Sequence, residues 1–274
     1  QQNAFSISDS TTLDANNGRL QFTNVCDPSI RSSVAGKTWN NVKILVGCSW
    51  AGGVFNGVFD IGGNFELATS SNYPGSFGGN ALFNLSGNLS LTASGPNGIN
   101  MGPTTIKLVG SGNQVISENG ISSNIFMGHF IIAQNAETGS VAFSSGQSFR
   151  FGGDFTFVSS NSVVTSGSTI GFANAVDDNT FTTNAGSIQF NNVEINIGNA
   201  GWNSHRTIVG TLQVAGNLVL NDPTYPGYIN GGGIEVAGNV TLNSDNMWGG
   251  TTSITMIGST PATVSQTAGG KFPG

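Results

Sequence analysis

Few side chains in this chain of 274 residues could take part in chemistry. Its only adjacent acidic pair is Asp177-Asp178, in the polar stretch from Asn174 to Asn179. Paired carboxylates could act as the acid and base of a glycosidase. With neighbouring Asn side chains they could instead supply the hard oxygen ligands that calcium prefers. No Asp-x-Asp-x-Asp-Gly loop is present, so we expect solvated loop carboxylates and leave calcium binding open.

The two histidines add little to this inventory. His129 and His205 lie far apart in the sequence, without an obvious Ser or Asp partner, and two cysteines and two histidines do not form a ligand cluster. The pair His205-Arg206 could bind a sulfated or uronic sugar, but we favour an exposed loop pair. The sequence therefore predicts no catalytic residue, no metal site and no cofactor.

Several aromatic residues lie outside the strand-like segments, beside small or polar residues. Such side chains could stack on sugar rings, because an aromatic ring has an apolar face and a wet edge. They could equally cover turns of the fold. Tyrosine also opens two Tyr-Pro-Gly loops, which are candidate surfaces for variable contacts. The candidate ligand-contact residues are Trp50, Trp202, Trp248, Tyr73 and Tyr225.

The chain has two cysteines, Cys26 and Cys48, 22 positions apart. In an extracellular protein this pair could form a disulfide, whereas in the cytosol two buried thiols are favoured. The low charge and the richness in Asn, Ser and Thr favour an extracellular setting. Spacing alone does not bring the two Cα atoms within bonding range, so both alternatives stay open.

The composition excludes some classes of function. Only 8% of the residues are charged and the formal net charge is −6, which excludes an electrostatic nucleic-acid binder. The 41 glycines and the scarcity of charged helix formers disfavour a helix-rich enzyme. Eighteen Phe residues supply enough apolar surface for a folded core. No apolar run approaches the roughly 20 residues that a membrane-spanning helix needs.

A short motif recurs along the chain. It consists of an apolar residue, a small residue, Gly, Asn or Asp, and then alternating apolar positions. We interpret each copy as a bend followed by a short strand, in which the Gly-Asn pair adopts positive φ. Asn side chains stacked at this position are expected to form hydrogen-bonded ladders, whereas Asp154 at the Asn position is expected to have a structural role in the turn. The copies are 61–67, 85–91, 151–157, 214–220 and 236–242.

The spacing of these motifs predicts the fold. Asn64 and Asn88 are 24 residues apart, and Asn217 and Asn239 are 22 apart. Such a period fits one coil of a solenoid better than a four-stranded propeller blade. We therefore expect an all-β, right-handed parallel β-helix with about 22–25 residues per coil. An array of β-sandwiches is the alternative.

A longer repeat contains the short one. The segment from Thr105 to Ser111 matches the segment from Ser253 to Ser259, so that residues 39–116 and 190–264 form two copies of one module. At Phe272 the sequence reaches the point where another strand of the pattern is expected. This pattern predicts that the repeats continue beyond Gly274.

The combination of these repeats resembles large secreted adhesins of Bacteroidota, which are exported by the type IX pathway and include gliding-motility adhesins. The resemblance covers roughly residues 38–270, and similar coils occur in autotransporter adhesins, phage tailspikes and polysaccharide lyases. Residues 1–37 do not match the repeat. We therefore expect an N-terminal cap over 1–37, which a Cys26–Cys48 disulfide could fasten to the first coil, followed by the repeat region over 38–274.

The expected function is that of a non-enzymatic, secreted or cell-surface structural protein, either an adhesin stalk or a filament subunit. Its expected partners are other copies of itself or surface glycans, with no nucleic acid and no membrane-spanning segment. One alternative is a polysaccharide-active β-helix enzyme, either a lyase or a glycoside hydrolase. The other is a glycan- or ice-binding solenoid, although paired threonines such as Thr182-Thr183 are too irregularly placed for a flat ice-binding array.

Overall fold

The structure is a computed structural model whose regular elements, within the residues it describes, are all β-strands, which confirms the predicted all-β fold. The chain forms two compact units, Gln1–Ala142 and Phe143–Gly274, and each is described here by itself. The described residues are 5–7, 18–22, 29–32, 38–46, 52–69, 75–93, 98–120, 125–134, 139–158, 162–173, 178–183, 189–196, 204–221 and 226–274.

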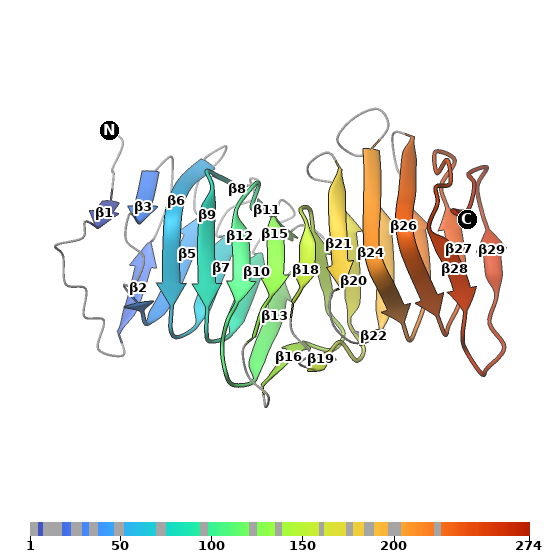
Figure 1. Cartoon of the computed structure of the whole chain (residues 1–274). Coiled ribbons are helices and arrows are strands. Elements are labelled where there is room, and N and C mark those ends of the chain that lie inside the picture. The colour runs from blue at the N-terminus through green and yellow to red at the C-terminus, as the bar shows by residue number, and fades with distance from the viewer. Residues whose placement is uncertain are drawn as a thin grey trace. The chain divides into compact units, whose positions relative to one another are not determined.

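The N-terminal unit is built from strands joined by turns (Figure 1). One further strand, β16 (Ser140–Phe143), crosses the boundary in the sequence between the two units. The strands of the N-terminal unit are β1 (Phe5–Ile7), β2 (Arg19–Phe22), β3 (Ser29–Ser32), β4 (Thr38–Trp39), β5 (Asn41–Val46), β6 (Gly52–Ile61), β7 (Phe65–Thr69), β8 (Gly75–Gly78), β9 (Ala81–Leu85), β10 (Leu89–Ala93), β11 (Ile99–Asn100), β12 (Thr105–Leu108), β13 (Gln114–Gly120), β14 (Ile125–Met127) and β15 (His129–Ile132).

All the strand pairs assigned within this unit are parallel, and each strand pairs with the equivalent strand of the next coil. In the sheet β2–β5–β7–β10–β13, Leu20 pairs with Val42, Val42 with Phe65, Phe65 with Leu89, and Leu89 with Ile116. The successive separations are 22, 23, 24 and 27 residues. The predicted cap contains β1, β2 and β3, which pair in parallel with β3, β5 and β6 in the same way as the later coils.

The C-terminal unit has the same construction (Figure 1). Its strands are β17 (Ser148–Phe151), β18 (Phe155–Phe157), β19 (Ser162–Val164), β20 (Thr169–Ala173), β21 (Asn179–Thr183), β22 (Gln189–Phe190), β23 (Asn192–Asn196), β24 (Ser204–Val214), β25 (Leu218–Asn221), β26 (Gly227–Val236), β27 (Val240–Asn243), β28 (Ser253–Met256) and β29 (Val264–Gln266).

Parallel pairing in the C-terminal unit follows the predicted period. Along β20–β23–β25–β27–β29, Ile170 pairs with Val193, Val193 with Leu218, Leu218 with Val240, and Val240 with Val264. These separations are 23, 25, 22 and 24 residues. Each unit is therefore a parallel β-solenoid, as the spacing of the Gly-Asn motifs predicts.

The core of each coil comes from alternating apolar residues. Strands such as β9 and β10 bury every second side chain, which is the period of a strand with one face in the interior. Phe65, Phe155 and Phe190 are at most 1% exposed, as the sequence predicts for core positions, while the side chain of Phe5 lies outside the described residues. Equivalent rings from successive coils contact one another within each unit, so that aromatic side chains stack along much of its interior.

Asparagine at the bend joins one coil to the next. The Oδ1 atom of Asn64 accepts a hydrogen bond from the backbone N–H of Asn88 at 2.9 Å, and Asn217 accepts one from Asn239 at the same distance. The predicted ladder is therefore present, but each rung joins a side chain to the backbone. Further rungs of this kind start at Asn41, Asn88, Asn113, Asn192 and Asn239.

The glycine of the Gly-Asn bends has a different role from the predicted one. Positive φ was expected at the Gly-Asn bends, but Gly63, Gly87, Gly216 and Gly238 are not among the residues with positive φ, so that prediction is wrong. A Cβ atom on Gly238 would lie 2.4 Å from the carbonyl oxygen of Gly216, and one on Gly87 would lie 2.2 Å from that of Gly63. Glycine is required because the backbones of adjacent coils approach too closely for any side chain.

Candidate functional site

A column of side chains from successive coils lies on the surface of the C-terminal unit. His205 on β24 pairs in register with Tyr228 on β26, and an isolated bridge joins Trp248 to Lys271 in the coils that follow. A second bridge, between Gly227 and Met247, aligns Tyr228 with Trp248. Since paired strands lie about 4.8 Å apart, this arrangement places one side chain per coil along a line. We name the set the aromatic column; its members are Asp178, His205, Tyr228, Trp248 and Lys271.

The aromatic column is held together by ring contacts and by hydrogen bonding to the carboxylate of Asp178. The rings of His205 and Tyr228 are stacked with centroids 5.3 Å apart, and those of Tyr228 and Trp248 meet edge to face at 5.9 Å. At the start of the column, Asp178 Oδ1 accepts a hydrogen bond from the backbone N–H of His205 at 2.9 Å and lies 3.1 Å from its Nδ1. These contacts fix the rings before any ligand arrives.

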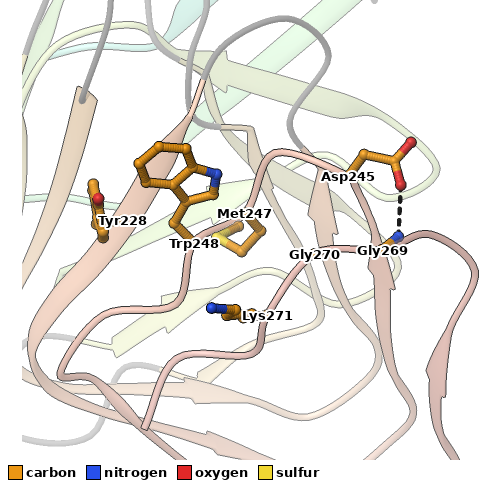
Figure 2. A pocket seen from close by; sticks show the side chains of 7 residues that line it. All are labelled: Tyr228, Asp245, Met247, Trp248, Gly269, Gly270 and Lys271. Carbon is orange, nitrogen blue, oxygen red and sulfur yellow. Dashed lines mark hydrogen bonds between the residues drawn. The ribbon is translucent and has the colours of Figure 1, made fainter.

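A hollow of about 460 Å³ lies beside the last two coils of the column (Figure 2). Tyr228, Met247 and Trp248 give it apolar walls, and Gly269 and Gly270 bring bare backbone to its edge. Charged groups at its rim are Lys271 and Asp245, whose Oδ1 accepts a hydrogen bond from the backbone N–H of Gly269 at 2.6 Å. The hollow thus combines flat apolar surface with one carboxylate and one ammonium group.

The local sequence explains why these side chains point outward. On β24 and β26, His205 and Tyr228 alternate with Arg206 and Ile229, which are buried. Trp248 precedes two glycines with φ of 95° and 133°, and a Cβ on the second, Gly250, would lie 1.9 Å from the carbonyl oxygen of Ile229. The tight turn after Trp248 therefore requires glycine.

Of the five predicted ligand-contact residues, the structure describes Trp248, which is 49% exposed and lines the hollow. Exposure is a requirement for the predicted contact with a ligand. The other four predicted residues lie outside the described residues, as do Asp177 and the two cysteines, so their roles and the disulfide stay predictions. These residues are Trp50, Trp202, Tyr73, Tyr225, Asp177, Cys26 and Cys48.

The prediction of an exposed His205-Arg206 loop pair is wrong. Both residues lie within strand β24, and Arg206 is only 2% exposed. Its Nη2 donates a hydrogen bond to the carbonyl oxygen of Ala173 at 3.3 Å, and its Cζ lies 5.8 Å from the centre of the Phe172 ring. Burial lowers the pKa of Arg206 to about 10, an effect that the carboxylate of Asp154 partly offsets. Arg206 therefore cannot bind a sugar from solution.

Two polar residues singled out in the sequence have structural positions. Asp154 Oδ1 accepts a hydrogen bond from the backbone N–H of Thr180 at 2.7 Å, which confirms its predicted role in the turn. His129 is half-buried on β15, where it pairs with Thr105 of β12. Within the described ranges, no three His, Cys, Asp or Glu residues form a group that could hold a metal ion.

Tyr228, Lys271 and Asp245 were missed in the sequence as candidate site residues. Tyr228 lies in a run of apolar and small residues that indicates an ordinary strand, and Lys271 and Asp245 are single charges in polar turns. The signal that links them is the register between coils, which places Tyr228 opposite His205 and Lys271 opposite Trp248.

Comparison of the chain with protein-family models, with curated proteins and with solved structures finds no match. Among the residues that the structure describes, no helix is long and apolar enough to span a membrane.

Proposed function

We propose that this chain is a non-enzymatic structural protein, secreted or held at the cell surface, which serves as an adhesin stalk or a filament subunit. The observation that carries this proposal is the edge formed by β28 and β29. Among the described residues, β28 and β29 each pair with a strand on one side only, and side chains at positions that are buried in earlier coils face solvent here. We name this surface the C-terminal edge.

The side chains of the C-terminal edge belong to columns that are otherwise buried. Met256 on β28 pairs with Val236, which is fully buried, yet Met256 is 39% exposed. Val264 on β29 pairs with the buried Val240 and is 59% exposed. Covering an apolar side chain of this size is worth about 1.5–3 kcal/mol. The edge therefore favours the addition of another parallel coil.

The equivalent coil of the N-terminal unit supports this interpretation. Ile106 and Leu108 on β12 correspond to Ile254 and Met256 in the long repeat. There the next coil covers them, because β15 pairs with β12 and places Phe130 opposite Ile106. Ile106 and Leu108 are therefore at most 1% exposed.

The proposed occupant of the C-terminal edge is a further parallel coil, supplied by a second copy of this chain or by the repeats that the sequence predicts beyond Gly274. β2 is the last strand of the 7-stranded sheet and pairs there with β5, and its side chains Leu20 and Phe22 are half-buried. The strand pairs assigned within each unit are all parallel, so β2 of a second copy would continue this pattern by pairing in parallel with the C-terminal edge. Head-to-tail contacts of this kind generate filaments.

Sedimentation velocity over a range of concentrations, followed by electron microscopy of material from the native source, tests the proposal. In sedimentation, we expect oligomers that grow with protein concentration. In electron microscopy, we expect linear assemblies on cell surfaces or in the secreted fraction. A chain that stays monomeric at high concentration and forms no filaments or stalks in the native material would contradict the proposal. Release of reducing or unsaturated sugars from added polysaccharides would favour the enzyme alternative.

A further inference from the structure

We propose that the aromatic column and its hollow form a binding site for neutral carbohydrate. The inference goes beyond the structural role and does not depend on end-to-end association. It rests on the register that collects His205, Tyr228, Trp248 and Lys271, and on the hollow lined by the last three (Figure 2).

The walls of the hollow match the chemistry of a sugar ring. A pyranose presents C–H groups on its faces and hydroxyl groups around its rim. Trp248 is 49% exposed and Tyr228 is half-buried, so both offer ring surface to solvent while staying anchored. An aromatic ring stacks on the C–H face of a sugar and leaves its own polar edge hydrated.

The polar groups of the hollow supply both kinds of hydrogen-bonding partner that hydroxyls need. The Asp245 carboxylate accepts hydrogen bonds, and the Lys271 ammonium group donates them. Asp245 is fixed by its bond to the Gly269 backbone, so it does not have to be ordered when a ligand binds. A preformed site loses less entropy on binding.

The charge around the column favours a neutral ligand over an anionic one. Asp178 and Asp245 contribute two negative charges, Lys271 contributes one positive charge, and the whole chain carries a formal charge of −6. The nearby cation that could have bound a sulfate or uronate, Arg206, is buried beneath the column. Nucleic acids and acidic glycans would thus meet net repulsion at this surface.

The geometry extends beyond one sugar. Successive members of the column belong to adjacent coils, which lie about 4.8 Å apart. An extended saccharide could therefore contact Trp248 with one ring and the stacked pair Tyr228–His205 with the next. This arrangement predicts tighter binding of an oligosaccharide than of its monosaccharide.

Affinity electrophoresis through gels that contain single polysaccharides tests the proposal. The neutral probes are mannan, xylan, laminarin and hydroxyethylcellulose, and the anionic probes are alginate and heparin. We expect at least one neutral probe to retard the protein. Trp248→Ala should weaken that binding about tenfold or more, Trp248→Phe should retain part of it, and Lys271→Met should weaken it.

The matched control is Val209→Ala, which trims another exposed apolar side chain of the same unit outside the column. It should bind as the unchanged protein does, and circular dichroism should show that all variants are folded. The proposal is overturned if no neutral probe retards the protein, if Trp248→Ala binds as well as the unchanged chain, or if only the anionic probes bind.

Discussion

Ile116 and Val264 occupy the same position in the two copies of the long repeat, yet Ile116 is fully buried and Val264 is 59% exposed. Each follows at least three buried residues of its own column, the last of which are Leu89 and Val240. Since the two positions are equivalent, the difference lies in what covers them. Val264 thus occupies a core position that no further coil covers among the described residues.

Val264→Asp is expected to weaken self-association of the chain about tenfold or more, because a carboxylate at this position would have to be buried between coils. Sedimentation velocity of the purified protein measures the change. The free energy of unfolding of the monomer should change little, since the side chain is already exposed.

The matched control for this prediction is Val209→Asp. Val209 is 45% exposed and lies on β24, away from the C-terminal edge. If this variant weakens association as strongly as Val264→Asp, association depends on net charge and not on the edge.

A second prediction concerns the asparagine ladder. Asn217→Ala removes the acceptor of the Asn239 N–H, and we expect the free energy of unfolding to fall by about 1 kcal/mol. Asn217→Asp keeps an acceptor oxygen at the same place, as Asp154 does naturally for the N–H of Thr180. It should therefore lower the free energy of unfolding less than Asn217→Ala does. Urea unfolding measures both variants. Equal losses would show that the oxygen acceptor is not what stabilises the bend.

A third prediction follows from the close approach of adjacent coils. Gly238→Ala would place a Cβ 2.4 Å from the Gly216 carbonyl oxygen, and we expect a loss of about 1–3 kcal/mol in unfolding free energy. Gly112→Ala is the control, because a Cβ there would have no atom within 4 Å and should change stability by less than about 0.5 kcal/mol. Thermal unfolding that gave both variants the same loss would contradict the steric explanation.

The fold could be predicted from the sequence because each coil repeats the same local pattern. Alternation places residues such as Leu89 and Leu91 in the core, and the spacing of Asn64 and Asn88 sets the length of the coil. The role of Gly87 could not be predicted, since positive φ and close backbone approach both select glycine. Only the stacked coils show which of the two applies.

Most of the candidate site could not be predicted, because it depends on register between coils. In the sequence, Arg206 is one of two adjacent basic residues flanked by Ser204 and Thr207. In the structure it shares an interior column with Asn179 and Ile229. The Gly-Asn bends alone, which are 22 residues apart, would pair Arg206 with Tyr228, but a register shift between Ile208 and Thr211 pairs it with Ile229.

The last prediction concerns Arg206, whose burial should reduce the stability of the protein. Its folded-state pKa of about 10 lies below the ordinary value of an arginine, so folding disfavours the charged form. This cost applies fully at pH 7 and is progressively lost as the pH rises above about 10. The Nη1 atom also has no hydrogen-bond partner. Arg206→Met, of similar length, should therefore leave the free energy of unfolding unchanged or raise it by about 1–4 kcal/mol at pH 7.

Urea unfolding at pH 7 and pH 11 checks this prediction. The difference in free energy of unfolding between Arg206→Met and the unchanged chain should be smaller at pH 11 than at pH 7. Asp154→Asn provides the second arm: it keeps the acceptor for Thr180 but removes the carboxylate that favours the charged guanidinium. Made in the unchanged chain, Asp154→Asn should lower the free energy of unfolding. Made in the Arg206→Met variant, it should change that free energy little. If Arg206→Met instead loses several kcal/mol at pH 7, the contacts with Ala173 and Phe172 outweigh the cost of burying the charge.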